Sequence, residues 1–352
     1  MPSPQGAPAP YPLLFRPTLF PKVWGGDRLA RYGKPVTPGE RIGESWELAD
    51  LPGTSASGAG GGPVRSTIAN GPLAGKTIHD AIDLWGDALL HRATRTPEGN
   101  FPLLIKFLDA REDLSVQVHP SPAYAASHKD AHLKTECWYI LDAAPGSLIY
   151  KGVKPGVTRE TFEHALRADN GKGVVDLLAA VPAVPGECHN LPSGTVHALG
   201  AGVLVAEVQT PSDTTFRVYD WGRTGRELHI EQALECIHWA PAPPAQRFER
   251  AGLHKGSMAT DWFMLSVYRS TDGAQGALDP GHICIALEGS GTVKPFAGDA
   301  PPTLPIRAGD TLFLPHRAPP AAIASGKGGS LTWCSVSIAT SALRLRETPE
   351  RP

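Results

Sequence analysis

Between residues 115 and 120 the chain reads SVQVHP, so that polar and apolar side chains alternate. Successive side chains of a β-strand point to opposite faces. Ser115, Gln117 and His119 therefore share one face, and the two intervening valines share the other. Polar groups on the inward face of an apolar strand are costly to bury unless something binds them. The segment predicts a strand whose polar face belongs to a binding site.

Two further segments carry side chains of the same chemistry. Lys134 and Glu136 are two residues apart and share a strand face. In the sequence PSGTVH at residues 192–197, the glycine permits a tight turn, and His197 then enters the next strand. Two imidazoles, a carboxylate and an amide oxygen are groups that a zinc ion accepts as ligands. Together the three segments predict a metal ion held inside a small β-barrel.

The composition is compatible with a β-rich globular protein. The chain has 352 residues, with 38 glycines and 35 prolines, which favours short strands and turns over long helices. A net charge of −2 argues against broad binding to nucleic acid or to a membrane surface. We find no signal peptide pattern and no apolar run of membrane-spanning length. The five cysteines are scattered without a CxxC pair, which favours reduced thiols and a cytoplasmic location.

The apolar pattern divides the chain into two β-rich parts. A Pro-rich joint at residues 240–245 predicts a catalytic metal-binding domain over residues 1–245 and a second β-domain over residues 246–352. Helical periodicity predicts helices over residues 76–91 and 158–180, the second of them within a helical insertion at about 152–185. Strands are expected at 101–108, 114–119, 137–141, 147–150, 186–191, 195–199, 202–209, 214–219, 261–269, 282–287, 291–296, 303–306, 311–315 and 331–337.

Two segments are predicted to lie outside the chemistry. The Gly/Ser-rich stretch at residues 52–63 is interpreted as a loop of no catalytic consequence. The charged, turn-like region around Arg223 and Arg226 is interpreted as an exposed loop.

The paired motifs resemble those of the cupin superfamily, and their order along the chain resembles class I mannose-6-phosphate isomerase (phosphomannose isomerase) in its short bacterial form. The resemblance is specific over residues 15–240 and rests only on overall pattern over 250–340. It implies a mainly β fold: a cupin jelly-roll barrel with a helical insertion, followed by a degenerate, metal-free cupin-like domain. The motifs that carry it are WGG at 24–26, GESW at 43–46, LIKFLDA at 104–110, LSVQVHP at 114–120, KTECW at 134–138, PSGTVH at 192–197 and QTPSDTTFRVYDW at 209–221.

The same resemblance implies which residues hold the metal. Carried over by motif, the zinc ligands fall on Gln117, His119, Glu136 and His197, with one zinc ion per chain. The catalytic arginine of the family falls on Arg217. A guanidinium group there can stabilise a developing negative charge or bind a phosphate, since it is always charged and offers several donors. The alternative for this arginine is a surface ion pair with a nearby aspartate.

Five more residues are candidates for the site. Lys134 and Glu207 are expected to act in catalysis, because each shares a strand face with site residues or lies in an otherwise apolar strand. Lys106, Ser115 and Glu44 are expected to bind the substrate.

The implied reaction interconverts mannose 6-phosphate and fructose 6-phosphate through an enediolate. The base that moves the proton is left open between Glu207, Lys134 and a zinc-bound hydroxide. Three alternatives remain: a cupin oxygenase using iron, since two histidines and one carboxylate also bind non-haem iron; an isomerase of other aldoses; and a non-catalytic sugar-binding cupin. The expected partner is a small sugar phosphate, with neither nucleic acid nor membrane, and the sequence does not indicate whether there are protein partners.

Overall fold

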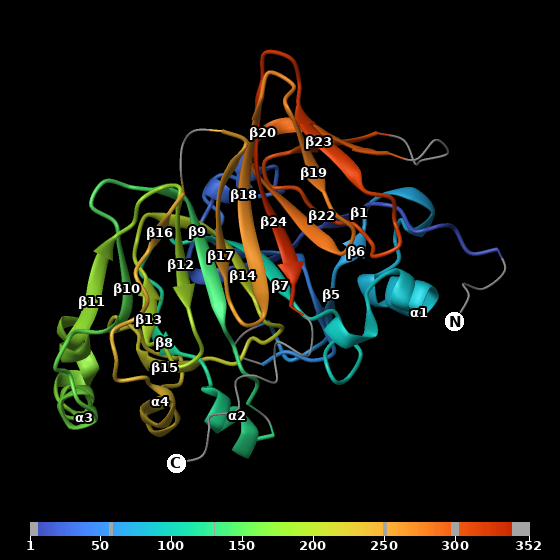
Figure 1. The fold of residues 1–352 in the computed structure, drawn as a ribbon. Coiled ribbons are helices and arrows are strands. Elements are labelled where there is room, and N and C mark those ends of the chain that lie inside the picture. The colour runs from blue at the N-terminus through green and yellow to red at the C-terminus, as the bar shows by residue number, and fades with distance from the viewer. Residues whose placement is uncertain (1–5, 56–58, 130, 249–251, 297–302, 340–352) are drawn as a thin grey trace.

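The protein folds into a mainly β structure of three large sheets, seen in a computed structural model that describes residues 6–55, 59–129, 131–248, 252–296 and 303–339 (Figure 1). Two of the sheets face each other and form a cupin barrel, and the third packs against the barrel's larger sheet. A two-stranded ribbon of β4 (Asp50–Leu51) and β5 (Val64–Arg65) is separate from them.

The barrel consists of a five-stranded and a seven-stranded antiparallel sheet. In spatial order, the smaller sheet contains β11 (Leu178–Pro182), β10 (Leu148–Val153), β13 (His197–Leu199), β8 (Val116–Val118) and β15 (Phe216–Tyr219). The larger contains β16 (Gln246–Arg247), β12 (Glu187–Leu191), β9 (Glu136–Ala143), β14 (Val203–Gln209), β7 (Leu104–Asp109), β3 (Ile42–Leu48) and β2 (Thr18–Gly26). Apolar side chains of both sheets, such as Ile149 and Val205, fill one end of the space between them, which leaves the other end for polar groups.

The third sheet is built mainly from the C-terminal part of the chain. Its main path is β17 (His254–Ala259), β18 (Phe263–Thr271), β24 (Ser330–Ile338), β20 (His282–Pro295), β22 (Thr311–Phe313), β1 (Leu13–Arg16) and β6 (Thr67–Ile68). Strands β19 (Gln275–Leu278), β21 (Leu304–Arg307) and β23 (Ala321–Ser325) pair off this path. The N-terminal strand β1 pairs with β22, so the first strand of the chain completes a sheet made of C-terminal strands.

The predicted domain boundary at residue 245 stays a prediction, and two N-terminal strands, β1 and β6, belong to the sheet of C-terminal strands. Leu13 and Leu14 pair with Phe313 and Leu312, and a large apolar core joins the seven-stranded sheet to the third sheet. Phe107 and Val208 contribute to this core from the barrel side, and Phe263 and Val336 contribute from the other. Of the predicted C-terminal domain, residues 249–251, 297–302 and 340–352 lie outside the described residues.

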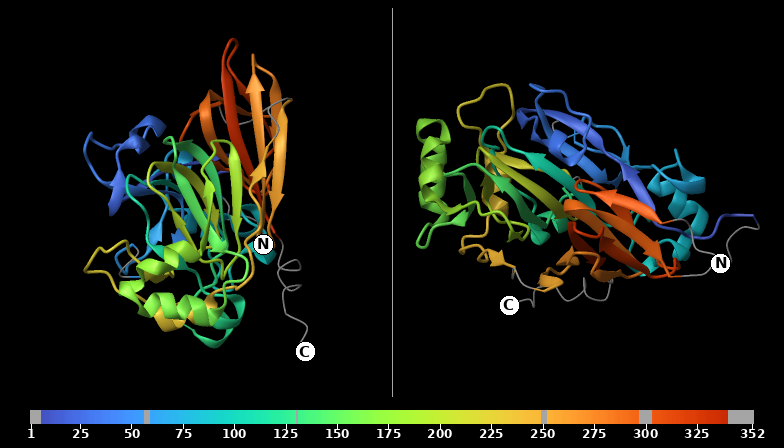
Figure 2. Two further views of the ribbon diagram at one scale, coloured as in Figure 1. Left: turned by 90° about the vertical axis from the view of Figure 1, so that its left-hand side faces the viewer. Right: turned by 90° about the horizontal axis from the view of Figure 1, so that it is seen from above.

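The helices cover the outside of the sheets. They are α1 (Ile78–Trp85), α2 (Pro122–Ser127), α3 (Arg159–Arg167) and α4 (Ile230–Cys236), with 3-10 turns at Arg28–Tyr32, Gly71–Leu73, Gly86–Ala88, Arg92–Thr94 and Asp169–Leu177. Capping boxes begin two of them, at Thr77 for α1 and at Thr158 for α3. Helices α3 and α4 pack on the outer face of the five-stranded sheet, at the end of the molecule opposite α1 (Figure 2).

Most predicted elements are present, with some differences. Helix α1 and the turn after it occupy residues 78–88 of the predicted 76–91, and α3 with its following turn lies within the predicted helical insertion. The strands predicted at 282–287 and 291–296 form one continuous strand, β20. The elements that were not predicted are β2, β3, β4, β5, β6, β11, β16, β17, β19 and β23 and helices α2 and α4. Strand β11 starts at Leu178, so the helix predicted over 158–180 is wrong at its end. Within the described residues, no helix is long and apolar enough to cross a membrane.

Candidate metal centre and adjoining cavity

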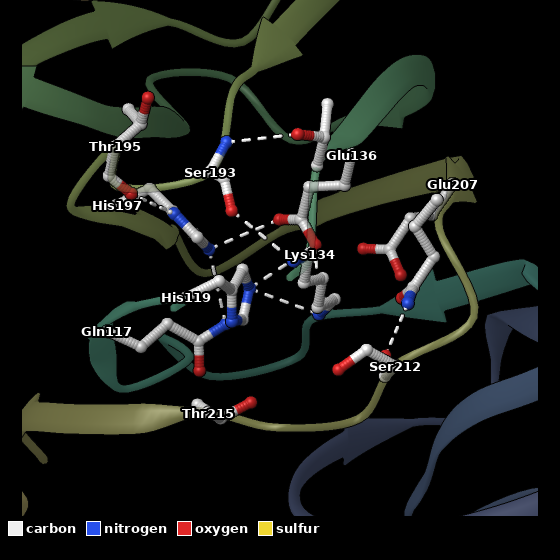
Figure 3. Close-up of polar contacts among 12 residues, drawn as sticks. Gln117, His119, Lys134, Glu136, Ser193, Thr195, His197, Glu207, Ser212 and Thr215 are labelled. Carbon is white, nitrogen blue, oxygen red and sulfur yellow. Dashed lines mark hydrogen bonds and ion pairs between the residues drawn. The ribbon is translucent and has the colours of Figure 1, made fainter. Parts of the chain in front are cut away.

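Three buried residues from the two facing sheets meet at the polar end of the barrel. His119 follows β8, Glu136 begins β9 and His197 begins β13. One ligand-type atom of each lies within 4.8 Å of the others. The carboxylate of Glu136 is 3.2 Å from His197 Nε2 and 3.4 Å from His119 Nε2, and the three side chains point toward one another (Figure 3). This arrangement can hold a metal ion.

The surroundings of these three residues fit a bound cation. The Nδ1 atoms of His119 and His197 lie 3.0 and 2.8 Å from the carbonyl oxygens of Thr214 and Thr195, which leaves each Nε2 facing the centre. The buried Glu136 carboxylate has the Lys134 ammonium 2.9 Å from its Oε2, and within the described residues neither of its oxygens forms a hydrogen bond of regular geometry. A buried carboxylate in that condition is costly unless a positive charge accompanies it.

Electrostatics keep Glu136 and His119 in the protonation states that metal ligands require. Burial would raise the pKa of Glu136, but the Lys134 ammonium and the neighbouring imidazoles outweigh it and hold the pKa well below its usual value. Burial, with the nearby Lys134 ammonium, lowers the pKa of His119 to about 3. Glu136 is therefore ionised and His119 neutral at pH 7, as metal ligands must be.

Gln117 lies beside the metal cluster, on the strand between the two that carry His197 and Arg217. It is the register partner of His197 on β13 and of Arg217 on β15. Its amide Nε2 is 3.3 Å from His197 Nε2, and its Oε1 accepts a hydrogen bond of 3.4 Å from Ser115. The alternation predicted for residues 115–119 is thus present, while direct ligation by Gln117 stays a prediction.

Lys134 is held against the metal cluster, on the face predicted from its spacing to Glu136. Its Nζ lies 2.9 Å from Glu136 Oε2 and 3.1 Å from His119 Nε2. Its backbone N–H donates to Ser193 Oγ at 3.3 Å, and the Ser193 N–H donates to Thr135 Oγ1 at 3.1 Å. The PSGTVH turn that precedes His197 therefore also fixes the backbone that carries Lys134.

A second charged group lies on the seven-stranded sheet. Lys106 Nζ is 3.6 Å from Glu44 and 3.4 Å from Glu207, and it sits 4.8 Å from the centre of the Trp46 ring. Trp138 Nε1 donates a 2.8 Å hydrogen bond to Glu207. Register explains the grouping, because Lys106 pairs with Trp46 on one side and with Glu207 on the other.

The two carboxylates of this group differ in acidity. Burial alone would raise the pKa of Glu44, but the ammonium groups of Lys106 and Lys22 outweigh it and lower the pKa to about 2. Burial and the neighbouring Glu136 carboxylate raise the pKa of Glu207, against the opposing effect of Lys106. Glu207 is the carboxylate more suited to exchanging a proton near neutral pH.

Arg217 is buried and faces the same space. Its side chain is not a surface ion-pair partner: the residue is 5% exposed, and its Nη1 donates to the carbonyl oxygen of Glu227 at 2.7 Å. Within the described part of the chain it forms no ion pair with either Asp213 or Asp220, and its buried Nε has no partner. Burial and the nearby Arg226 lower the pKa of Arg217.

These residues share one cavity of about 90 Å³. The cavity reaches the metal cluster through Gln117 and Lys134, which touch it. Every residue predicted for catalysis or substrate binding is in its wall, and the wall is completed by residues that were not predicted. The predicted members are Glu44, Lys106, Ser115, Gln117, Lys134, Glu207 and Arg217; the others are Lys22, Trp24, Trp46, Ser55, Leu108, Leu114, Trp138, Asp213, Thr215 and Arg226.

Two loops that the sequence analysis put outside the chemistry contribute residues to the wall of this cavity. The loop at 52–63 takes part in the wall, because the backbone N–H and hydroxyl of Ser55 donate to Asp213 at 2.7 and 2.9 Å; residues 56–58 of the loop lie outside the described residues. The region of Arg223 and Arg226 is a loop with exposed residues such as Thr224 and Glu227, as predicted, but the two arginine side chains are at least three-quarters buried against Asp220. The cluster of arginines after the YDW motif was the available signal for Arg226; Ser55 had none.

Comparison with known proteins finds similarity to mannose-6-phosphate isomerases. The type I phosphomannose isomerase catalytic domain matches residues 16–148. The mannose-6-phosphate isomerase ManA of Bacillus subtilis (strain 168) is 39% identical over 238 residues, covering 66% of this chain and 70% of that protein. YvyI of the same organism is 35% identical over 326 residues, 88% of this chain and 94% of that protein. A crystal structure of mannose 6-phosphate isomerase from Bacillus subtilis superposes with a TM-score of 0.71 at 31% identity, covering 93% of this chain and all of that one.

A cupin barrel with a His/Glu/His cluster beside a charged cavity defines a cupin enzyme with a candidate metal centre. Among such proteins, the chain belongs to the type I phosphomannose isomerase family, and it is therefore an aldose–ketose isomerase.

Proposed function

We propose that this chain is a zinc-dependent enzyme that interconverts mannose 6-phosphate and fructose 6-phosphate through an enediolate intermediate. The observation that carries the proposal is the contact between the His119–Glu136–His197 cluster and a cavity that holds both proton-transfer candidates and Arg217. The names of relatives such as ManA support the substrate.

Zinc is a metal that the donor set fits, and we propose it for this site. Two neutral imidazoles and a carboxylate form a common catalytic zinc site that leaves a position for substrate or water. We propose one zinc ion per chain, held by His119, Glu136 and His197, with Gln117 as the fourth protein ligand through its amide oxygen. When bound, the ion would supply a Lewis acid for the oxygens at C1 and C2 of the open-chain sugar.

The other chemical roles, which are charge stabilisation, proton transfer and sugar binding, are assigned to residues that line the cavity. Removing the proton from C2 leaves negative charge on the enediolate oxygens, and we assign the Arg217 guanidinium to stabilising that charge. Glu207, whose Oε1 has no hydrogen-bond partner among the described residues, and Lys134, through its Nζ, are the two side chains that can carry the proton from C2 to C1. Lys106, Ser115 and Glu44 bind sugar oxygens along the wall.

The three alternatives make different demands on the same site. An iron oxygenase would use the same two histidines and carboxylate, but membership in the isomerase family favours proton transfer. A non-catalytic sugar-binding protein would have no use for the coupled charges of Lys106, Glu44 and Glu207. An isomerase of other aldoses would share the whole site and differ only in which substrates it accepts. The cytoplasmic location stays a prediction.

The test measures isomerisation of mannose 6-phosphate and metal content on the same sample. We expect about one zinc per chain, loss of activity with a chelator and recovery with zinc. The His197→Gln variant should lose both metal and activity, whereas Glu207→Gln should retain the metal and lose turnover. A zinc-loaded wild-type protein that does not convert mannose 6-phosphate would refute the substrate. Oxygen uptake with bound iron would move the proposal to an oxygenase, and turnover of other aldoses alone would change the substrate class.

A further inference from the structure

The cavity has two ends that differ in charge balance. On the seven-stranded sheet, the Lys106 ammonium lies within 3.6 Å of two carboxylates, those of Glu44 and Glu207. At the other end, Arg217 and Arg226 enter the wall from β15 and from the loop that follows it. Arg217 has no carboxylate within 4 Å among the described residues. The positive charge at the arginine end is therefore less well neutralised by nearby carboxylates than the positive charge of Lys106.

Asp220 fixes the orientation of Arg226. This aspartate is 3% exposed, and it accepts a 2.8 Å hydrogen bond from Arg226 Nε and a second from Arg226 Nη2. The two bonds use one edge of the planar guanidinium group, so its remaining N–H donors, including those of Nη1, stay available. Nη1 has no hydrogen-bond partner within the described ranges of the chain.

A neighbouring arginine shares Asp220 but not the cavity. Arg223 Nη2 is 2.8 Å from Asp220 and donates to the carbonyl oxygen of Asp113 at 2.7 Å. Its Nη1 also lies 3.8 Å from Glu112, which gives Arg223 a second carboxylate. Glu112 lies closer to Arg41, at 2.9 Å, so Asp220 is the main carboxylate for both Arg223 and Arg226. Positive charge is therefore in excess beside Arg217 and Arg226, the two arginines that line the cavity.

The position of this end relative to the metal cluster suits a sugar with a remote anionic group. His197, Gln117 and Arg217 are register partners on three successive strands. Neighbouring strands are about 4.8 Å apart, so the backbone of Arg217 lies roughly 10 Å from that of His197. A sugar whose C1 and C2 oxygens lie between the metal cluster and the Arg217 guanidinium can then extend its far end toward Arg226.

We propose that Arg226, oriented by Asp220, binds the phosphate of the sugar phosphate and thereby selects phosphorylated over unphosphorylated sugars. This inference rests on the proposed function and assigns to it a residue that the sequence pattern did not suggest. Guanidinium groups bind phosphate through paired, charge-assisted hydrogen bonds. Asp220 is a positioning residue, since it acts through Arg226.

The experiment compares Arg226→Met with the matched control Arg223→Met, which removes an equal charge from the same aspartate outside the cavity. Loss of a hydrogen bond to a charged group costs about 1.5–3 kcal/mol, which corresponds to roughly 10–100-fold in binding. We expect Arg226→Met to raise KM for mannose 6-phosphate by that factor with kcat nearly unchanged. The inhibition constant of inorganic phosphate should rise in parallel. Arg226→Lys should recover part of the affinity, and Arg223→Met should leave both constants near those of the wild type.

Several outcomes would overturn the assignment. The assignment would be wrong if the Arg226→Met and Arg223→Met variants had equal KM values and equal inhibition constants for phosphate. It would also be wrong if Arg226→Met lowered kcat alone. Failure of the proposed function is a separate result, because the wild type would then not convert mannose 6-phosphate. Calorimetric titration with inorganic phosphate still tests Arg226 in that case: weaker binding to Arg226→Met than to Arg223→Met would retain the anion site, and equal binding would reject it.

Discussion

A buried ion pair between Lys34 and Glu47 joins the barrel to the third sheet. Lys34 Nζ lies 2.6 Å from Glu47 Oε2 and donates to the carbonyl oxygen of Gly309 at 2.6 Å. The two side chains are 4% and 2% exposed. Ser45 Oγ donates to the other carboxylate oxygen at 2.5 Å. Because Glu47 is on β3 and Gly309 lies between β21 and β22, the pair links the two halves of the molecule.

Removing one member should cost far more than removing both. A buried charge that loses its partner costs about 3–5 kcal/mol, whereas replacement of a whole pair by neutral side chains is often close to neutral. We therefore expect Lys34→Met and Glu47→Gln each to destabilise the protein by about 3–5 kcal/mol. At about 2 °C per kcal/mol for a chain of this size, the fall in Tm is about 6–10 °C. The double variant should cost less than either single variant, so the coupling energy of the double-mutant cycle should be at least about 3 kcal/mol.

The two single variants should differ in how their stability depends on pH. Burial raises the pKa of Glu47 above its ordinary value of 4.5, and the Lys34 ammonium opposes that rise. Without Lys34 the pKa rises further, so the folded state of Lys34→Met binds a proton more readily than the unfolded state. Its stability then increases as the pH falls toward 4.5. The penalty of Lys34→Met should shrink over that window, and Glu47→Gln, which has no carboxyl group, should show no such recovery.

Denaturant unfolding followed by tryptophan fluorescence, from pH 7.5 down to about pH 5, measures all three variants. Single variants that cost less than about 1 kcal/mol would refute the view that this pair is buried and coupled. So would a double variant that costs the sum of the singles, or a Lys34→Met penalty that does not change with pH.

Three further predictions concern the site. The Glu44 carboxylate should stabilise the folded wild type by about 3 kcal/mol above pH 4.5, because its pKa falls from 4.5 to about 2 on folding. Glu44→Gln removes this stabilisation, and the wild type loses it as the pH falls toward 2. Thermal unfolding curves of the two proteins should therefore converge in acid. Gly194 has φ +88°, and a Cβ there would lie 2.8 Å from the carbonyl oxygen of Cys236, so Gly194→Ala should cost at least about 1 kcal/mol and reduce bound zinc, as measured by unfolding and metal analysis. Trp138→Phe removes the donor to Glu207 and should lower kcat about 10–100-fold with little change in KM; unchanged steady-state kinetics would contradict a role for that hydrogen bond.

The sequence could predict which side chains share a face, because that follows from strand periodicity alone. Ser115 and Gln117 are on one face as expected, and Lys134 lies beside Glu136. It could not predict Ser55 or Arg226, which reach the cavity from loops whose paths depend on distant contacts, with Asp213 and Asp220. The pairing of β1 with β22 was equally inaccessible, since it joins residues about 300 positions apart in the chain.

Strand periodicity also leaves the register between strands undetermined, and here the register decides the chemistry. Val116 and Val118 on β8 pack under Phe162 of α3 and Leu234 of α4. A slip of β8 by one residue would turn these valines into the cavity and bury the polar face against the helices, at a cost that no site contact could offset. Helices that touch neither the metal cluster nor the cavity therefore hold Gln117 in line between His197 and Arg217. The helical insertion, which the sequence marks only as an interruption of the barrel, helps to set the spacing between the candidate metal ligands and the arginine end.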